Sequence, residues 1–475
     1  MPVDDWLETT VGDFIDEHGG EIKTGPFGTK LKASEYTEEG VPVISVGEVG
    51  YGELRLHDKT PKVDASITDR MPEYVLHEGD IVFGRKGAVE RSARVREHQA
   101  GWFLGSDGIR LRLPTNCDRR FIAYQFLSRK HKNWMMQQAL GSTMPSLNQK
   151  IIARIPIVVP PLPEQRAIAS ILGALDDKIE LNRRMNATLE SLARAIFKSW
   201  FVDFDPVKIK SQKKKEAVAK SIADLKNAGD LASKSWLLKS LRYELSQLDN
   251  SLFPFKLQDS KLGPIPEGWE VERFADHITV TRGLSYKGAG LADEGTPMHN
   301  LNSIYEGGGY KHKGIKYYTG EYRDRHEVIP GDLIATNTEQ GFEHRLIGCA
   351  ALVPKRYGEK GIYSHHIYRI RMEEESSLSP HYMLRLINSS RWHSWIAGFS
   401  NGTTINMLPK DALEMPLLVV PPAELVQHFT QLASSISDEI EDSILESESL
   451  ARTRDALLPR LLSGELSVDE LLTEQ

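Results

Sequence analysis

The chain contains a long internal repeat, and this repeat limits the folds that it can adopt. Gly141-Ser142-Thr143 stands before an apolar stretch that ends at Pro160-Pro161, and Gly402-Thr403-Thr404 stands before a similar stretch that ends at Pro421-Pro422. In both copies the glycine lies 19 residues before the first proline. Each copy is far longer than the roughly 20 to 50 residues of a solenoid repeat, so the sequence predicts two globular domains in tandem.

Further matched positions support the repeat. They are Trp6 with Trp269, Gly79-Asp80 with Gly331-Asp332, Tyr124 with Tyr382, and Trp134 with Trp395. The offset between partners drifts from 252 to 263, as expected when loops change length while core elements do not. Two similar modules in one chain indicate a target with two parts, each read by one module.

The pattern around the proline pairs predicts the fold class. Short β-like runs precede each pair, and a long stretch of helical periodicity follows it. We therefore predict an α+β chain with two β-rich domains in tandem, separated by two long antiparallel coiled-coil-like helices. The expected segments are a first β-rich domain at 1–160, a central helix at 161–205, a basic helical connector at 206–262, a second β-rich domain at 263–422 and a C-terminal helix at 423–475.

Both predicted helices carry a seam with alternating steps of three and four residues, which is typical of paired helices. In the first helix the seam residues are Ile168, Leu172, Leu175, Ile179, Asn182, Asn186, Leu189 and Ile196, and in the second they are Phe429, Ile436, Ile440, Leu450 and Leu457. Asparagines on such a seam cost stability but fix the pairing register. Alternatively, the seam reaches a solvated edge at Asn182 and Asn186.

Charge and length add two expectations about these helices. The segment 206–226 contains seven lysines, whereas residues 423–475 carry 3 basic and 12 acidic residues, so opposite charge favours association of the two helical regions. About 38 helical residues, 163–200, at about 1.5 Å each would span roughly 57 Å, which exceeds the roughly 34 Å repeat of a DNA duplex. Modules attached near opposite ends of this helical pair would reach successive major grooves on one face of the DNA.

Composition limits the class of protein. The sequence has 40% hydrophobic residues but no apolar run near the roughly 18 residues of a membrane span, and its start does not resemble a secretory signal. Only Cys117 and Cys349 are present, so we expect a soluble protein in the reducing cytoplasm, without membrane association. The net charge of −7 does not exclude nucleic acid, because residues 1–160 carry 21 basic against 22 acidic residues and the acidic excess lies in the C-terminal helix.

Four strings give the chain a resemblance to a known family. They are PPLPEQRAI at 160–168, FKSWFVDFDPV at 197–207, LGPIPEGW at 262–269 and LLPRLLSGEL at 457–466. Together with the tandem organisation, they resemble the specificity subunit of a type I DNA restriction-modification enzyme. The second helix departs from this pattern, because Ala423-Glu424-Leu425-Val426 stands where the first has Leu-Pro-Glu-Gln.

The resemblance implies a function without catalysis. Two target-recognition domains would each bind one half of a split, asymmetric double-stranded DNA site, and the helical pair would set the length of the unread spacer. Such a subunit directs methyltransferase (modification) subunits, implied to be two, and restriction/translocase subunits to the site. The resemblance therefore implies no cofactor of its own, with S-adenosylmethionine, ATP and Mg bound by the partner subunits.

The residues themselves offer little for catalysis. The proline pairs follow Val159 and Val420, so the Asn/Asp-Pro-Pro-aromatic loop of an amino-methyltransferase is missing, and no GxxxxGK[ST] loop for ATP occurs. Glu21-Ile22-Lys23 resembles the end of a nuclease motif, but a match of three residues is expected by chance. The histidines lack ligands at metal-binding spacing. We predict no catalytic and no metal-binding residues.

Candidate DNA contacts are positions where glycine lets the backbone approach a phosphate and a cation or amide lies beside it. In the first module they are Lys23, Thr24, Lys30, Arg85, Lys86, Arg91, Arg94, Ser142 and Thr143, and in the second they are Arg282, Tyr286, Lys287, Asn337, Thr338, Arg345, Asn401, Thr403 and Thr404. The competing interpretation for each is an ordinary solvated turn. The tryptophans Trp102, Trp134, Trp392 and Trp395 are assigned to the core.

Two other classes of function stay open. The chain could be a coiled-coil scaffold whose β modules bind protein partners, in which case binding to random duplex would show no steep dependence on salt. It could also be a nuclease, which would require metal-dependent cleavage by this chain alone.

Overall fold

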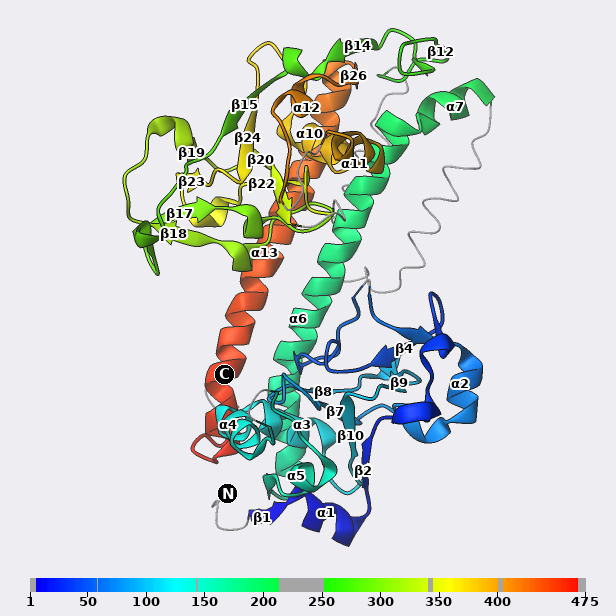
Figure 1. Ribbon diagram of the computed structural model, residues 1–475, viewed down its shortest axis with the longest axis vertical. Helices are drawn as coiled ribbons and strands as arrows, with labels where there is room; N and C mark the ends of the chain where they lie inside the picture. The colour runs from blue at the N-terminus through cyan, green and yellow to red at the C-terminus, as the bar shows by residue number, and fades with distance from the viewer. Residues whose placement is uncertain are drawn as a thin grey trace. The chain divides into compact units, whose positions relative to one another are not determined.

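A computed structural model describes residues 6–57, 59–141, 144–212, 252–340, 345–399 and 405–468 of the chain (Figure 1). The chain divides into two compact units, unit 1 with Met1–Asn182 and Leu445–Gln475, and unit 2 with Arg183–Ile444. Both divisions fall inside the two longest helices. Each unit therefore contains one part of each long helix.

Unit 1 consists of short strands and helices followed by one long helix. In chain order these elements are β1 (Leu7–Thr10), α1 (Val11–His18), β2 (Glu21–Thr24), β3 (Tyr36–Thr37), β4 (Val41–Ile44), β5 (Tyr51–Gly52), β6 (Lys62–Val63), α2 (Ala65–Arg70), β7 (Ile81–Gly84), β8 (Ser92–Arg94), β9 (Phe103–Leu104), β10 (Gly108–Arg112), α3 (Arg119–Leu127), α4 (Arg129–Gln138), α5 (Gln149–Ala153), β11 (Pro156–Val159) and the start of α6 (Leu162–Phe197).

The centre of unit 1 is a sheet with the strand order β2-β10-β7-β8-β5. Side chains alternate between its two faces. Ile81 and Phe83 pack on one face with the helices, whereas Val82 packs on the other face with a second sheet of order β3-β6-β4-β9. In this second sheet β4 runs parallel to β9, and β1 pairs separately with β11.

Unit 2 begins within α6 and ends within α13. After α6 come a π-helical turn (Lys198–Val202), α7 (Asp205–Gln212), β12 (Leu257–Gln258), β13 (Ile265–Pro266), β14 (Glu270–Arg273), β15 (Ile278–Arg282), β16 (Leu291–Ala292), β17 (Thr296–His299), β18 (Lys316–Tyr318), β19 (Glu327–Val328), β20 (Leu333–Thr336), β21 (Thr338–Gln340), β22 (Ala350–Leu352), β23 (Gly361–Tyr363), β24 (Ile367–Met372), α10 (Pro380–Ile387), α11 (Ser390–Ala397), β25 (Ile405–Met407), α12 (Asp411–Glu414), β26 (Leu417–Val420) and α13 (Ala423–Leu462).

The sheets of unit 2 repeat those of unit 1. The order β15-β24-β20-β22 matches β2-β10-β7-β8, and the order β16-β18-β17-β23 matches β3-β6-β4-β9. The second sheet again contains one parallel pair, β17 with β23, and β14 pairs with β26 as β1 does with β11. The predicted fold class, α+β with two β-rich modules and long helices, is confirmed.

One ion pair occupies the same place in both units. The carboxylate of Asp80 accepts hydrogen bonds at 2.8 and 2.7 Å from the guanidinium of Arg112, and Asp332 accepts the same two bonds at the same distances from Arg371. Each aspartate also accepts from a backbone N–H three residues earlier in the chain, at His77 and Ile329. The repeated Gly-Asp thus anchors one sheet strand to its neighbour in each unit.

The structure corrects one pair of the repeat. Ser128 and Ser389 both cap the helix that follows them, and Trp134 and Trp395 lie in these helices at the same offset of 261. At this offset Tyr382 corresponds to Phe121 and not to Tyr124. The two tyrosines also bond differently, Tyr124 to the Asp176 carboxylate and Tyr382 to the Val419 carbonyl.

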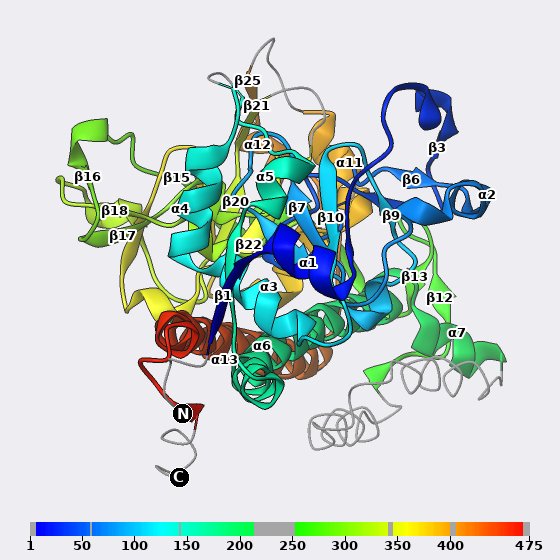
Figure 2. The same cartoon turned by 90° about the horizontal axis from the view of Figure 1, so that it is seen from below.

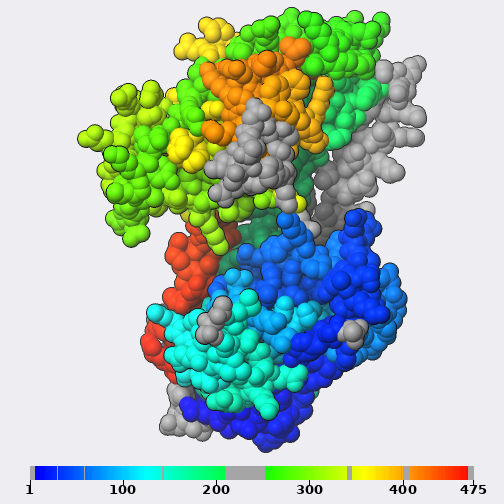
Figure 3. Space-filling model, viewed as in Figure 1, coloured from blue at the N-terminus to red at the C-terminus, as the bar shows by residue number. Residues whose placement is uncertain are grey.

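The long helices run antiparallel within each unit (Figures 1 and 2). In unit 1, Asp176 bonds to Arg454 at 2.7 Å and Lys178 pairs with Glu446 at 3.2 Å, so positions rise along α6 as they fall along α13. In unit 2, the rings of Phe197 and Phe429 lie 5.6 Å apart. The outer side of the end of α13, red in Figure 3, is visible at the surface.

The predicted seam residues differ in burial. Asn182 is fully buried, and its amide donates to Glu446 at 2.6 Å and to Ser447 at 3.2 Å, so it bonds across to the second helix. Near the end of α13 the buried positions are Leu458 and Leu461. Of the predicted seam residues, the buried ones are Ile168, Leu172, Asn182, Leu189, Ile196, Phe429 and Ile436, and the half-buried ones are Leu175, Ile179, Asn186, Ile440, Leu450 and Leu457.

The helices end differently from the predicted segments. α6 stops at Phe197 and continues as the π-helical turn, after which Phe204 adopts a φ of 53°, a left-handed conformation that a helix cannot contain. α13 stops at Leu462. Most of the predicted basic connector, 213–251, lies outside the described residues. In the part of the chain that the structure describes, none of the helices has the length and apolar character needed to cross a membrane.

Candidate nucleic-acid interface

Most of the candidate loops of unit 1 meet at one end of its central sheet. We call this end edge 1, formed by residues 24–25, 85–86, 105–107 and 146–147. The backbone N–H of Arg85 donates to the Asp107 carbonyl at 2.9 Å, and Leu147 donates to the Arg85 carbonyl at 2.8 Å. These bonds join segments that are far apart in the sequence.

Unit 2 builds an equivalent edge 2 from residues 282–283, 337–338, 364–366 and 407–408. Here Asn337 donates to the His366 carbonyl at 3.0 Å, and Leu408 donates to the Asn337 carbonyl at 2.8 Å. Arg85 in unit 1 therefore corresponds to Asn337 in unit 2. The same backbone carries different side chains in the two units.

A close approach of two backbone segments explains the glycine at each edge. A Cβ added at Gly25 would lie 1.8 Å from the carbonyl oxygen of Gly105, and one added at Gly283 would lie 2.3 Å from that of Ser364. Gly105 and Ser364 are themselves equivalent, because both accept a backbone bond from the residue three positions later. Only glycine fits where the strand end and the turn touch.

The side chains of edge 1 are mainly cationic. The guanidinium of Arg85 lies 4.2 Å from the centre of the Phe27 ring and donates to the Ser106 carbonyl at 3.1 Å. Lys86 is exposed, and its ammonium lies 3.6 Å from the Asp107 carboxylate. Edge 1 thus presents two cations held beside one carboxylate.

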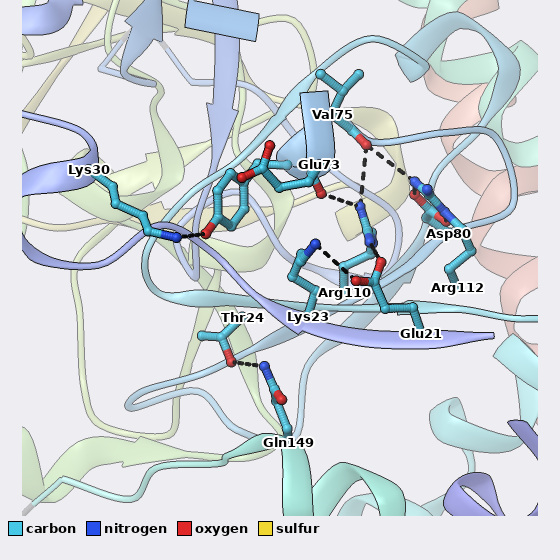
Figure 4. Close-up of polar contacts among 11 residues, drawn as sticks. Glu21, Lys23, Thr24, Lys30, Glu73, Val75, Asp80, Arg110, Arg112 and Gln149 are labelled. Carbon is cyan, nitrogen blue, oxygen red and sulfur yellow. Dashed lines mark hydrogen bonds and ion pairs between the residues drawn. The ribbon is translucent and has the colours of Figure 1, made fainter. Parts of the chain in front are cut away.

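Lys23 and Lys30 lie beside the ring of Tyr74. Figure 4 shows both lysines, and Thr24 of edge 1 with its partner Gln149. The ammonium groups of Lys23 and Lys30 lie 5.8 and 5.6 Å from the centre of the Tyr74 ring, and Lys30 donates to its hydroxyl at 3.2 Å. The hydroxyl of Thr24 accepts from Gln149 at 3.2 Å. Lys30 remains exposed and available to a phosphate.

Glu21 of the nuclease-like Glu21-Ile22-Lys23 has structural partners (Figure 4). Its carboxylate accepts from the buried guanidinium of Arg110 and pairs with Lys23 at 2.9 Å. Burial raises the pKa of Glu21, but the hydrogen bond from Lys23 and the charge of Arg110 outweigh burial and hold this pKa below its usual value. Within the described ranges, no three His, Cys, Asp or Glu side chains are grouped to hold a metal ion.

Arg91 and Arg94 do not share one site. Arg91 follows the turn after edge 1 and lies beside Glu90 and the Tyr51 ring. Arg94 pairs in register with Ile81, at the opposite end of β7 from Arg85. Three residues of an extended strand move a side chain by about 10 Å, so Arg94 faces a different part of unit 1.

Edge 2 is more polar and more buried than edge 1. Asn337 and Thr338 are only 1% and 4% exposed, the Asn337 amide donates to the His365 carbonyl at 3.0 Å, and Thr338 contacts the His366 ring nitrogen at 3.0 Å. Arg282 is exposed and donates to the His365 carbonyl at 3.2 Å. The Ser106 carbonyl at edge 1 and the His365 carbonyl at edge 2, which are equivalent, are thus each bound by an arginine.

Three buried polar atoms at edge 2 have no hydrogen-bond partner in the described part of the chain. They are the Asn337 amide oxygen, the Ser364 hydroxyl and the Nδ1 atom of His365. Burial lowers the pKa of His366, and the neighbouring His365 and Arg282 lower it further. Because buried polar groups are normally satisfied, these atoms mark a place where a polar ligand or water completes the site.

The remaining candidates of unit 2 surround edge 2 at different depths. Tyr286 is half-buried, with its ring 6.4 Å from that of His365, and Lys287 is exposed. Arg345 is exposed, with its guanidinium 4.0 Å from Glu306. Ser142, Thr143, Asn401, Thr403 and Thr404 lie outside the described residues.

Several residues at the edges were not among the sequence candidates. Asp107 and the turn 105–108 carry the Gly-Ser-Asp-Gly signature of a tight turn, which is a usable sequence signal. His365 and His366 carry no sequence signal for this place, because their proximity to Asn337 and Thr338 depends on tertiary contacts alone. The core assignment of the tryptophans is wrong for Trp395, which is 46% exposed, whereas Trp392 is buried.

Comparisons with known proteins show which proteins this chain is similar to. Residues 4–191 match the family model described as "Type I restriction modification DNA specificity domain". The chain is 25% identical over 354 residues to the HindI specificity subunit of Haemophilus influenzae, covering 70% of this chain and 73% of that protein. It is 23% identical over 356 residues to the MjaIX specificity subunit of Methanocaldococcus jannaschii, covering 74% and 70%.

A solved structure supports the fold over nearly the whole chain. The crystal structure of a type I restriction-modification system S subunit from M. genitalium covers 96% of both chains with a TM-score of 0.50 and 13% identity. This likeness concerns the fold, and the sequence matches concern the family. Together, the sequence matches show that the chain is similar over most of its length to specificity subunits of type I restriction-modification enzymes.

Proposed function

We propose that this chain recognises a bipartite, asymmetric DNA site, with edge 1 binding one half and edge 2 the other. The observation that carries the proposal is the repeated backbone with different side chains. Both edges keep the glycine contact and the same backbone hydrogen bonds, but Arg85 and Lys86 in unit 1 are replaced by Asn337 and Thr338 in unit 2. Two copies of one scaffold with different polar groups suit two different half-sites.

The chemistry of each edge is consistent with this division. Lys86 and Lys30 are exposed cations that would neutralise phosphates, and Arg85 is a candidate for guanine, which arginine binds through O6 and N7. At edge 2, Arg282 and Lys287 would hold phosphates. The unpaired atoms of Asn337, Ser364 and His365 would then find partners on base edges or on bridging water.

We further propose that the chain directs partner subunits and performs no chemistry itself. The similarity to specificity subunits supports assembly with methyltransferase subunits, two in our proposal, and with restriction/translocase subunits. S-adenosylmethionine, ATP and Mg would be bound by those subunits. Glu21, the carboxylate of the nuclease-like motif, is engaged by Arg110 and Lys23, which is consistent with a structural role.

The test uses the full chain co-purified with its methyltransferase subunits. We expect this complex to protect and methylate a site with two separated halves, and the chain alone neither to cleave nor to methylate. Exchange of residues 1–150 for those of another family member should change one half only. Binding of the complex to random duplex should also fall steeply with salt, and a flat response would favour the protein-binding scaffold.

The spacing between the halves gives a separate experiment. α6 has 36 residues and would span about 54 Å at about 1.5 Å per residue. Four residues added to both long helices would lengthen each by roughly 6 Å, so we expect the preferred unread gap to widen by about two base pairs. An unchanged gap would show that the helices do not set the spacing.

A further inference from the structure

Unit 1 has a small pocket on the side of β8 that faces α3 and α6. Its volume of about 30 Å³ suits a small ion or about two water molecules and is too small for a nucleotide. The polar residues that line it are Ser92, Arg94, Arg96, Arg120, Tyr124 and Asp176. Three arginines and one aspartate therefore line this space.

The acidic groups near this pocket already have partners. Asp176 accepts from the Tyr124 hydroxyl at 2.6 Å and from Arg454 at 2.7 Å. Arg120 is held by both oxygens of Asp177, at 3.0 and 2.8 Å. Asp177 therefore balances the charge of Arg120, and Asp176 balances that of Arg454 beside the pocket.

Arg94 and Arg96 form no ion pair in the described ranges, although the charge of Glu78 acts on Arg94 and partly offsets its neighbours. Neither guanidinium makes a hydrogen bond or ion pair with any residue in the described ranges. Arg94 is half-buried, and burial together with the charges of Arg120 and Arg96 lowers the pKa of its guanidinium. A partly buried cation beside two like charges is unfavourable unless an anion joins it.

The shared fold does not require these arginines. Arg94 pairs with Ile81 as Leu352 pairs with Leu333, so Leu352 is the equivalent residue in unit 2 and Pro354 is the equivalent of Arg96. Both replacements are uncharged and occupy the same sheet position. The arginine pair is therefore a property of unit 1 beyond its scaffold.

We propose that this pocket binds a small oxyanion, a phosphate or carboxylate group, through Arg94 and Arg96. Planar guanidinium groups bind both chemistries through paired N–H donors. The site lies at the opposite end of β7 from edge 1, so it is distinct from the proposed DNA contacts. Its wall also includes Asp176 of α6, whose carboxylate is already bound by Tyr124 and Arg454.

Thermal unfolding of the full chain in chloride, phosphate and formate at matched ionic strength tests the proposal. We expect phosphate or formate to raise the wild-type Tm by about 4 °C relative to chloride. The anion that gives the larger rise shows whether the pocket prefers a phosphate or a carboxylate group. Arg94→Leu, which installs the unit 2 residue, should remove this rise. Arg94→Leu should not lower the Tm in chloride, because the substitution removes repulsion among the positive charges of Arg94, Arg96 and Arg120.

Two control variants separate this site from other effects. Lys150→Gln at an exposed position of α5 and Arg129→Leu at an exposed position of α4 should both keep the oxyanion-dependent rise. The proposal is overturned if the wild type shows no rise, if Arg94→Leu keeps the rise, or if Arg94→Leu lowers the Tm in chloride. Its failure would leave the DNA proposal intact, because edge 1 and edge 2 do not include the pocket.

Discussion

Replacement of Gly25 by alanine should disrupt edge 1 while leaving edge 2 intact. The new Cβ would lie 1.8 Å from the Gly105 carbonyl oxygen, whereas real contacts of this kind stay above 3.0 Å. The strand end and the turn must therefore separate by more than 1 Å. Overpacking of this kind costs about 1 to 3 kcal/mol, and loss of the Gly25–Gly108 backbone hydrogen bond adds about 1 kcal/mol. We expect Gly25→Ala to lower the free energy of unfolding by about 3 kcal/mol.

Gly47 and Gly288 provide matched controls in the two units. A Cβ at either position meets no atom within 4 Å, so Gly47→Ala and Gly288→Ala should be neutral or stabilising by about 0.5 kcal/mol. Gly283→Ala, whose Cβ would lie 2.3 Å from the Ser364 carbonyl oxygen, should disrupt edge 2 as Gly25→Ala disrupts edge 1. The comparison therefore isolates the close approach from the general effect of a glycine substitution.

Urea unfolding and hydrogen exchange measure the loss of stability at the edge. Methylation by the complex of DNA sites altered in one half or the other measures the loss of recognition. Gly25→Ala should speed exchange at residues 24–25, 85–87 and 105–108 and relax recognition of one half-site only, and Gly283→Ala should relax the other. If Gly25→Ala is as stable as Gly47→Ala, the packing argument is wrong. If both glycine variants relax the same half-site, the assignment of one edge to each half is wrong.

Three further predictions concern stability. Burial lowers the pKa of His131 to about 4 from an unfolded value near 6.5, so the contribution of neutral His131 to stability is complete above pH 6.5 and is lost as the pH falls towards 4. In an acid titration, the free energy of unfolding of the wild type should therefore fall by about 3 kcal/mol more than that of His131→Gln. Asp80→Asn removes the carboxylate that pairs with Arg112, a side chain that is 29% exposed, and we expect urea unfolding to show a free energy of unfolding lower by about 2 to 3 kcal/mol. The decrease should be smaller for Asp332→Asn, because its partner Arg371 is 40% exposed. Asn182→Leu should change stability by less than about 1 kcal/mol in either direction, because apolar burial offsets the lost bonds to α13, and a loss above about 2 kcal/mol would identify the amide as a net stabiliser.

The parts of the fold that sequence analysis predicts well are those with a long, regular signal. Heptad spacing over some 30 residues identifies α6 and α13, and the proline pairs mark the residues just before they begin. The ends of these helices were less predictable. The π-helical turn at Lys198–Val202 depends on how Trp200 and Phe201 pack into the core of unit 2, which is tertiary information.

Several loops with glycine beside basic residues meet at edge 1 and edge 2, and their contact with DNA stays a prediction. The state of their side chains could not be predicted. Sequence cannot show that Asn337 is 1% exposed or that Arg94 lies at the other end of its strand pair, because both depend on pairing between distant segments. Sequence alignment of the repeat by residue identity also paired Tyr124 with Tyr382, although the capping serines place Phe121 there.

The core of each unit is completed by a helix end from the other half of the chain. In unit 1, Leu458 and Leu461 at the end of α13 pack in the same core as Leu172, and in unit 2, Phe197 near the end of α6 packs on Phe429. Burial of one such side chain contributes about 1.5 to 3 kcal/mol, so neither half of the chain alone retains the full stability of its unit. In the described ranges, the side chains of Arg85 and Lys86 at edge 1 contact Ser106 and Asp107, and those of Asn337 and Thr338 at edge 2 contact His365 and His366. Exchange of edge residues should therefore alter recognition of one half-site without loss of the other, whereas truncation of either long helix should weaken both units.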